Sequence, residues 1–333
     1  MIILVLLLTF KVLFLLFPTT VLTAAREGLF LWLNNVMPAL LPFMIVTNML
    51  IATGFARHLG NLLAPVMRRV FGLPGAGGFA FVIGLTSGYP LGAKTVADLH
   101  KNGELTTQDA QHLLAFCNNA GPLFILGVVG VGFFENVTMG YVLWAGHVLA
   151  AVVVGVLLRG KADCVTASRA LPVTNVDIGK VLDFSGNQRR RVKMFWNQGA
   201  FSRVNSSFRI SLLGDSVKNA MESMAVIGGL IIFFNAVVAV LGEIGLPDSG
   251  MLAGIMAGAV EVTSGVRKIS YIGVSAASVG ATAFAIAFGG FSIHMQTFHF
   301  TEGTGISAKK YLLCKILHGV VAAVISVFLW VWL

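Results

Sequence analysis

Amide, hydroxyl and charged side chains interrupt apolar stretches of this sequence in two regions. The residues concerned are Ser87, Gly88, Tyr89, Lys94, Asn118 and Asn119 in the first region and Glu261, Ser264, Gly265, Ser292 and Gln296 in the second. Amides and hydroxyls both donate and accept hydrogen bonds, and a buried polar group without a partner is costly. Each polar side chain must therefore bond to a neighbouring helix or to a ligand. We predict that the set forms a substrate-binding site without catalytic residues.

The two charges in this set indicate what the substrate carries. An ionisable residue in a membrane-embedded stretch is a functional hypothesis by default. Lys94 would balance an anionic substrate, and Glu261 would hold a proton or Na⁺ that drives uptake. Salt bridges are the alternative, since Lys94 and Asp98 are four residues apart and would meet on one helix face. Glu261 and Lys268 could also pair across a turn, and for Asp98 and Lys268 we favour such pairing.

Small residues at the ends of short helices would add backbone donors to the site. Ser87 and Gly88 follow one apolar piece, and Ser264 and Gly265 follow another. Neither piece reaches the length of about 20 apolar residues that a spanning helix needs. The ends of such half-helices leave N–H groups unpaired, and these groups bind carboxylate or phosphate.

The amides and histidines leave alternatives open. For Asn119, contact with a ligand and contact with another helix are equally favoured. For Asn118 we favour the ligand less, because adjacent helical residues point about 100° apart. His294 and His299 are five residues apart, but no carboxylate or cysteine completes a metal site with them. We therefore predict packed or interfacial histidines and no metal.

Composition sets the class of protein. The chain has 333 residues, of which 56% are hydrophobic and 11% charged, and its mean hydropathy is +0.86. A soluble domain carries roughly a quarter charged residues, so we predict an all-α polytopic protein of the cell membrane, in contact with the lipid bilayer. Cys117, Cys164 and Cys314 are isolated and imply neither disulfides nor zinc. No nucleophile elbow, phosphate-binding loop or metallohydrolase motif occurs, so we predict neither an enzyme nor a resident cofactor.

The first 36 residues form the first predicted domain. Residues 1–24 are an apolar run whose one charge is Lys11, and we interpret them as an uncleaved span with the N-terminus inside. A cleaved signal peptide is the alternative, but no positively charged segment precedes the apolar core. The segment around Trp32, up to residue 36, is typical of the membrane–water interface. A second span is predicted from about 38 to 56.

The two following membrane regions, 37–159 and 216–333, show the same order of features. Each has a span, a short apolar piece, a polar Ser-Gly tip, an interrupted span and a final span. The tips are Thr86–Gly88 and Thr263–Gly265, and the number of crossings between equivalent points is odd, which makes the halves opposite in orientation. Paired interrupted helices in inverted repeats are the transporter pattern. We predict an inverted repeat with two re-entrant helical hairpins and two transmembrane helices broken near Asn118 and Gly289.

A basic segment separates these two regions. Eleven of the 23 Lys and Arg residues lie between Arg159 and Lys218, in a chain of net charge +9. Basic loops between spans are typical of the cytoplasmic side, so residues 160–215 are predicted to form a cytoplasmic loop. Nucleic-acid binding is disfavoured, because the loop has no recognisable fold signature. Attraction to anionic lipid stays open.

Three segments, Gly84–Lys94, Leu114–Phe124 and Phe288–Gln296, carry a resemblance to a known family. They resemble the sporulation integral membrane protein YlbJ family, within the nucleoside-recognition Gate domain group. Gate domains are similar to the halves of concentrative nucleoside transporters and to the membrane part of bacterial ferrous-iron transporters. The resemblance implies a transporter-like fold with two re-entrant hairpins. By motif it carries over Ser87, Gly88, Tyr89, Pro90, Lys94, Asn118, Gly121, Pro122, Glu261, Ser292 and Gln296.

Residues and resemblance together give three functional expectations. The first is a sporulation-associated transporter or permeation protein for a small organic anion, for which the resemblance suggests dipicolinate. The second is a nucleoside-type carrier, although the sequence shows no aromatic sandwich for a nucleobase. The third is a non-conducting membrane scaffold required for spore assembly. The oligomeric state stays open, a homo-oligomer included.

Overall fold

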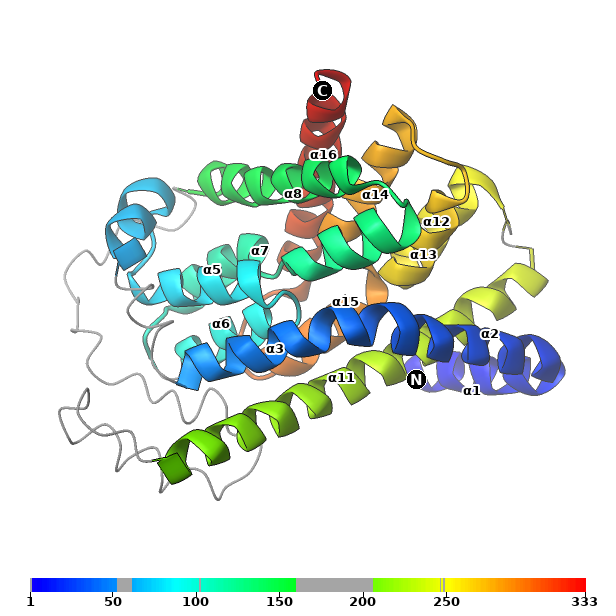
Figure 1. The fold of residues 1–333 in the computed structure, drawn as a ribbon, viewed down its shortest axis with the longest axis horizontal. Coiled ribbons are helices and arrows are strands. Elements are labelled where there is room, and N and C mark those ends of the chain that lie inside the picture. Colours follow the sequence, from blue (N-terminus) through cyan, green and yellow to red (C-terminus); the bar gives the residue numbers. More distant parts are fainter. Residues whose placement is uncertain (1, 53–61, 102, 160–205, 246, 248) are drawn as a thin grey trace.

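The computed structural model describes residues 2–52, 62–101, 103–159, 206–245, 247 and 249–333, and within them every regular element is a helix (Figure 1). The first half contains α1 (Ile2–Leu16), α2 (Pro18–Leu31), η1 (Trp32–Val36), α3 (Met37–Ala52), η2 (Met67–Phe71), α5 (Ala76–Thr86), α6 (Leu91–Lys101), α7 (Thr107–Cys117), η3 (Phe124–Phe133) and α8 (Val137–Leu157). The second half contains α11 (Ser206–Glu243), α12 (Gly250–Val260), α13 (Val262–Ser270), α14 (Ala276–Phe288), α15 (Gly290–Thr301) and α16 (Ala308–Val331). The three η segments are π-helical.

Four helical stretches in the described residues are long and apolar enough to cross a membrane. They are α8, Leu212–Glu243 of α11, the consecutive α14 and α15, and α16. Two bent pairs, Leu8–Leu16 with Pro18–Val36 and Leu62–Phe71 with Ala76–Thr86, would raise the number to six. Helices satisfy their own backbone hydrogen bonds, as the hydrocarbon core requires. The prediction of an all-α polytopic membrane protein is thus confirmed.

The N-terminal segment departs from the predicted single span over residues 1–24. The helix axis bends by 101° where α1 meets α2, and Pro18 is the first residue of α2. Proline has no N–H to donate to the preceding turn, so it begins a helix well and continues one poorly. From Pro18 the chain runs without a turn through α2, η1 and α3, and this long helix lies alongside α11 (Figure 1). Trp32 packs against Gly228 of α11.

The described end of the central polar segment is helical. Residues 206–215, which the sequence assigned to the cytoplasmic loop, are already part of α11, whose apolar portion begins at Leu212. The helix therefore continues beyond its apolar portion, because a helix closes its backbone hydrogen bonds equally well in water and in lipid. Residues 160–205 lie outside the described part of the chain, so the sidedness of the loop stays a prediction.

Each half presents the same order of elements. A long helix (α3 or α11) precedes two short helices (α5 and α6, or α12 and α13), a helix with a break, and a final long helix (α8 or α16). The final helices α8 and α16 pack against one another, and α6 of the first half packs against α15 of the second. The interrupted helices of both halves therefore face a common interior.

The start and end of α7 are fixed by local contacts. Thr106 and Asp109 form the N-terminal cap, since the Thr106 hydroxyl accepts from the Asp109 N–H and the Asp109 carboxylate accepts from the Thr106 N–H. At the other end, a Cβ atom added to Gly84 of α5 would lie 1.7 Å from the carbonyl oxygen of Cys117, and one added to Gly92 of α6 would lie 2.2 Å from it. The backbones of α5 and α6 therefore pack directly against the C-terminal end of α7, because Gly84 and Gly92 have no side chains to separate them from it.

Candidate functional site at the helix breaks

The turn between α5 and α6 lies against the break that follows α7. Ser87 ends α5, and Gly88 has a φ of +79°, which favours glycine. A Cβ atom added to Gly88 would lie 2.5 Å from the backbone nitrogen of Gly121. The structure therefore brings Ser87 and Gly88 next to the segment that contains Asn118 and Asn119.

The second turn differs from the prediction. α12 ends at Val260 and α13 begins at Val262, so Glu261 alone joins the two helices in an extended conformation. Its carboxylate accepts hydrogen bonds from the N–H groups of Thr263, at 3.0 Å, and Ser264, at 2.6 Å. This cap lets α13 begin at once. The predicted tip at Thr263–Gly265 is therefore wrong, because these residues form the first turn of α13.

The second hairpin also touches the break of its own half. A Cβ atom added to Gly265 would lie 2.1 Å from the Cα atom of Gly258, so α12 and α13 cross in backbone contact. One added to Gly290 would lie 2.8 Å from the carbonyl oxygen of Gly258. Ser292 and Gln296 follow this break on α15. In both halves, then, the short-helix pair lies against the interrupted helix.

Glu261 connects the second hairpin with α11. Its side chain is buried, with 2% of its surface exposed. The Ser264 hydroxyl lies 2.7 Å from Oε2 of Glu261 and 2.6 Å from Oδ1 of Asn235 on α11. Ser264 therefore connects Glu261 and the start of α13 to Asn235 of α11.

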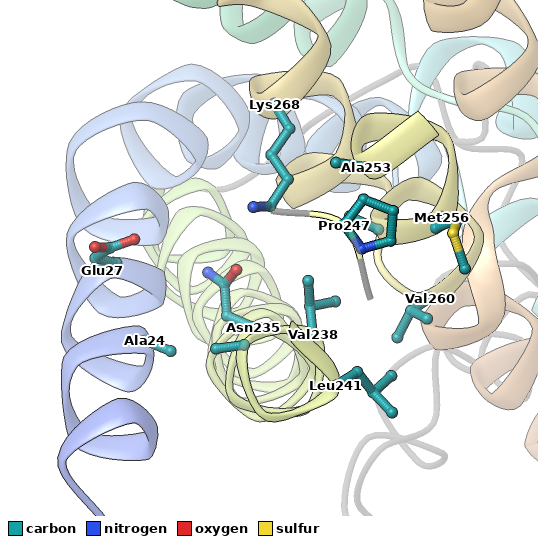
Figure 2. A pocket seen from close by; sticks show the side chains of 12 residues that line it. Ala24, Glu27, Asn235, Val238, Leu241, Pro247, Ala253, Met256, Val260 and Lys268 are labelled. Atoms are coloured by element: carbon teal, nitrogen blue, oxygen red, sulfur yellow. The ribbon is translucent and has the colours of Figure 1, made fainter. Parts of the chain in front are cut away.

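Two cavities lie beside the second hairpin. One of about 100 Å³ lies between α2, α11 and α12, and Figure 2 shows Asn235 and Lys268 projecting towards each other there. The other, of about 430 Å³, is lined by Arg267 and Tyr271 among other residues. Glu27 lines both. Charged side chains therefore surround the second hairpin, and Lys268 faces the smaller cavity.

Asn118 links the first break to the second half of the molecule. It is fully buried, and its Nδ2 donates to the Thr297 hydroxyl at 2.9 Å and to the Tyr311 hydroxyl at 2.8 Å. The Thr297 hydroxyl donates to the carbonyl of Ile293 and must accept from Asn118, which fixes the orientation of the amide. Oδ1 of Asn118 is then a buried acceptor without a hydrogen-bond partner among the described residues.

Asn119 and Gln296 show the same pattern. Nδ2 of Asn119 donates to the carbonyl of Phe116 at 2.7 Å, and Nε2 of Gln296 donates to the carbonyl of Ser292 at 3.3 Å. Carbonyl oxygens only accept, so both amides are fixed with their oxygens elsewhere. Within the described residues those oxygens are buried and have no partner. Leaving a buried acceptor unpaired costs about 1–3 kcal/mol, which favours a ligand or water at each.

The remaining predicted residues of the first half lie around the same turn. The Ser87 and Tyr89 hydroxyl oxygens are buried without hydrogen-bond partners among the described residues. Tyr89 packs against a core cluster that includes Ala120 of the first break and Val262 of the second hairpin. Lys94 lies further along α6 and is partly buried, and its role stays a prediction.

The sequence analysis missed a second lysine, Lys315, at the first break. Lys315 of α16 is 1% exposed, and its Nζ donates to the backbone oxygen of Asn118 at 2.9 Å and to Nδ1 of His318 at 3.0 Å. His147 of α8 accepts from the N–H of Ala120 at 3.2 Å. A lysine within an otherwise apolar span is a functional signal in itself, and the final span contains one. The residues of this cluster come from helices of both halves.

Comparisons with known proteins agree with these features. The family model described as nucleoside recognition, Gate, matches residues 33–130, which contain the first hairpin and the first break. The sporulation integral membrane protein YlbJ of Bacillus subtilis (strain 168) is 31% identical over 332 residues, which is 94% of this chain and 78% of that protein. No solved structure matches the chain significantly. A relative of this identity over this length establishes kinship, and the chain belongs to the YlbJ family of integral membrane proteins.

Proposed function

We propose that this protein is a multi-pass membrane carrier or permeation protein for a small organic anion. The observation that carries the proposal is the first break, where buried amide oxygens and hydroxyls without partners among the described residues lie beside the buried amino group of Lys315. Polar groups at membrane depth are tolerated where they line a ligand path. The relative's name places that protein in sporulation, and we extend this association to the present chain.

The architecture we propose is an inverted repeat. The α5–α6 and α12–α13 pairs would be re-entrant hairpins, and the interrupted α7–η3 and α14–α15 segments would be the broken spans. The repeated order of elements and the contact of each hairpin with its own break support this arrangement. An odd number of crossings between equivalent points would make the halves opposite in orientation. The basic segment 160–205 would then be cytoplasmic.

The substrate would bind where the two halves meet. Asn118, Asn119 and Gln296 offer amide oxygens, and Ser87 and Tyr89 offer hydroxyls. Lys94 would add a positive charge at the first hairpin. Glu261, with Ser264 and Gly265, would provide the proton or Na⁺ site that couples transport to an ion gradient. We propose no catalytic chemistry, since these groups bind and orient a ligand without a nucleophile–base pair.

Uptake into proteoliposomes tests this function. We would measure entry of labelled dipicolinate with wild-type protein and with Asn119→Ala, with and without proton and sodium gradients. Gln108→Ala is the matched control, because that amide is exposed on the surface of α7. The expected result is uptake by wild type and control and a decrease of about tenfold or more in the variant. Failure of folded wild-type protein to take up dipicolinate under any gradient would contradict the proposal.

A nucleoside carrier is the second candidate. The matching family model is described as nucleoside recognition, and the unpartnered amide oxygens would suit the hydroxyl and amino donors of a nucleoside. Competition separates the two, because uridine should displace a bound nucleoside substrate and leave organic-anion uptake unchanged. The scaffold alternative predicts that Asn119→Ala leaves the biological function of the protein intact.

A further inference from the structure

The polar cluster around Lys315 joins four helices of the protein interior. Its members are Asn118 at the end of α7, His147 of α8, His294 and Thr297 of α15, and Tyr311, Lys315 and His318 of α16. All seven side chains are buried. The cluster contains residues of both halves of the chain, so its hydrogen bonds depend on how the two halves pack together.

The hydrogen bonds of the cluster fix where protons lie. Nδ1 of His318 lies 3.0 Å from Nζ of Lys315 and accepts from it, so the His318 proton lies on Nε2, which points to the carbonyl of His147 at 3.5 Å. Nε2 of His147 accepts from the N–H of Ala120 at 3.2 Å. Its proton therefore lies on Nδ1, which is buried without a hydrogen-bond partner among the described residues.

His294 offers a second unused donor. The Tyr311 hydroxyl accepts from Asn118 and can donate its own proton to Nδ1 of His294, 3.4 Å away. When Tyr311 donates in this way, the His294 proton lies on Nε2, an atom that is buried and unpartnered within the described residues. The cluster thus offers donors on two histidines that no described residue satisfies. A lysine ammonium has three N–H donors, and Lys315 uses two, so protonation of Lys315 would add a third free donor.

Lys315 has no carboxylate partner in the described part of the chain. Its hydrogen-bond partners are a backbone carbonyl and an imidazole, and the thiols of Cys117 and Cys314 lie nearby. The carbonyl end of α7 compensates only part of a full charge. An ammonium without a counter-ion is strongly disfavoured in a low-dielectric interior. A bound anion beside it would reverse that preference.

We propose that Lys315, with the free donors of His147 and His294, forms an anion subsite that takes up one proton when the anion binds. The empty subsite then holds a neutral amine and the occupied one an ammonium–anion pair. Anion and proton would cross the membrane together, because each stabilises the other in the subsite. This inference rests on the proposed transport of an organic anion, and it assigns the coupling proton to Lys315 rather than to Glu261.

The other groups around Lys315 do not carry this proton. On α16 itself Tyr311 and Cys314 lie nearby, and His318 already accepts from Lys315. α7 contributes Cys117, α8 contributes His147 and α15 contributes His294. α14, which packs along α16, has no charged residue or histidine. Near Lys315 these described elements thus contribute histidine, tyrosine and cysteine side chains, and no carboxylate contacts Lys315 within the described residues.

Calorimetry on the purified full chain tests the proposal. Dipicolinate would be titrated into wild-type protein at several pH values between 6 and 9, in two buffers with different enthalpies of protonation. Dipicolinate is ionised throughout this range, as carboxyl groups titrate near pH 4. Uptake of up to one proton per dipicolinate bound is expected, and dipicolinate affinity should fall about tenfold per pH unit where the empty site is neutral.

Lys315→Met removes the charge with little change in length, and Lys310→Met is the matched control, since Lys310 is exposed on the same helix. Proton uptake should vanish in Lys315→Met and persist in Lys310→Met. Binding by wild type without proton uptake at any pH would refute the coupling and leave the proposed function standing. Absence of dipicolinate binding and transport by folded wild type would refute both. If Lys315→Met does not fold, the wild-type measurement still decides.

Discussion

The two helix breaks have the same neighbours in their own halves and very different surroundings beyond them. The first, at Asn118–Gly121, is fully buried and bonds to α8, α15 and α16 through the cluster that contains Lys315. The second, at Gly289–Gly290, is built from glycines with φ of +91° and +72° and lies against the backbone of Gly258. A break in a membrane helix exposes backbone groups that something must satisfy.

This difference indicates that the two breaks have different roles. Polar side chains of the second half form hydrogen bonds with the first break. These bonds therefore depend on how the two halves pack together. Glycine packing closes the second, and the nearby Gln296 bonds within its own helix. We therefore expect ligand chemistry to concentrate at the first break and close backbone packing to be required at both.

The largest expected effect is common to both halves. Gly84→Ala and Gly265→Ala would each place a methyl group on backbone atoms, 1.7 Å from the Cys117 oxygen and 2.1 Å from the Gly258 Cα atom. Backbone cannot yield to such overlap, so both variants should lose most of the folded protein, measured as monodisperse yield after detergent extraction. Gly229→Ala, with open space around it, is the control. Normal yield of either hairpin variant would show that its hairpin is not held as closely as described.

An intermediate effect should separate the breaks. Asn118→Ala removes the amide that donates to the Thr297 and Tyr311 hydroxyls, whereas Gln296→Ala removes one bond to its own helix. We expect Asn118→Ala to lower anion uptake about tenfold or more, and Gln296→Ala to lower it several-fold less. Initial uptake rates in proteoliposomes measure both. An equal decrease of the uptake rate in the two variants would contradict the different roles of the two breaks.

The smallest effect sharpens the comparison to a single hydroxyl. Tyr311→Phe removes the group that joins Asn118 to His294 and keeps the ring that packs against His294 and Phe298. Interhelical hydrogen bonds in membranes are worth about 1 kcal/mol, so a melting temperature a few degrees lower is expected. Tyr141→Phe, on the exposed face of α8, should not change it. If Tyr311→Phe lowered the melting temperature as much as Asn118→Ala does, the Tyr311 hydroxyl would account for the whole stabilising contribution of the Asn118 side chain.

Patterns in the sequence predicted some of these features and missed others. The breaks after Cys117 and at Gly289 were predicted, because asparagine, glycine and proline interrupt otherwise apolar helices there. The second hairpin was misplaced because a Ser-Gly pair looks like a turn, whereas Glu261 caps α13 before it. Lys315 was missed because its span is apolar overall, and one lysine changes an average very little.

By itself the sequence determined that this is a helical membrane protein with two interrupted regions in each of two halves. Length, hydropathy and the positions of glycine and proline act locally, so they can be evaluated without knowing what lies beside them. Only the tertiary structure decided which polar groups meet. Asn118, His147 and Lys315 come from three helices, and their contact depends on how α7, α8 and α16 pack. That packing rests on glycine contacts far apart in sequence, which leave no local pattern.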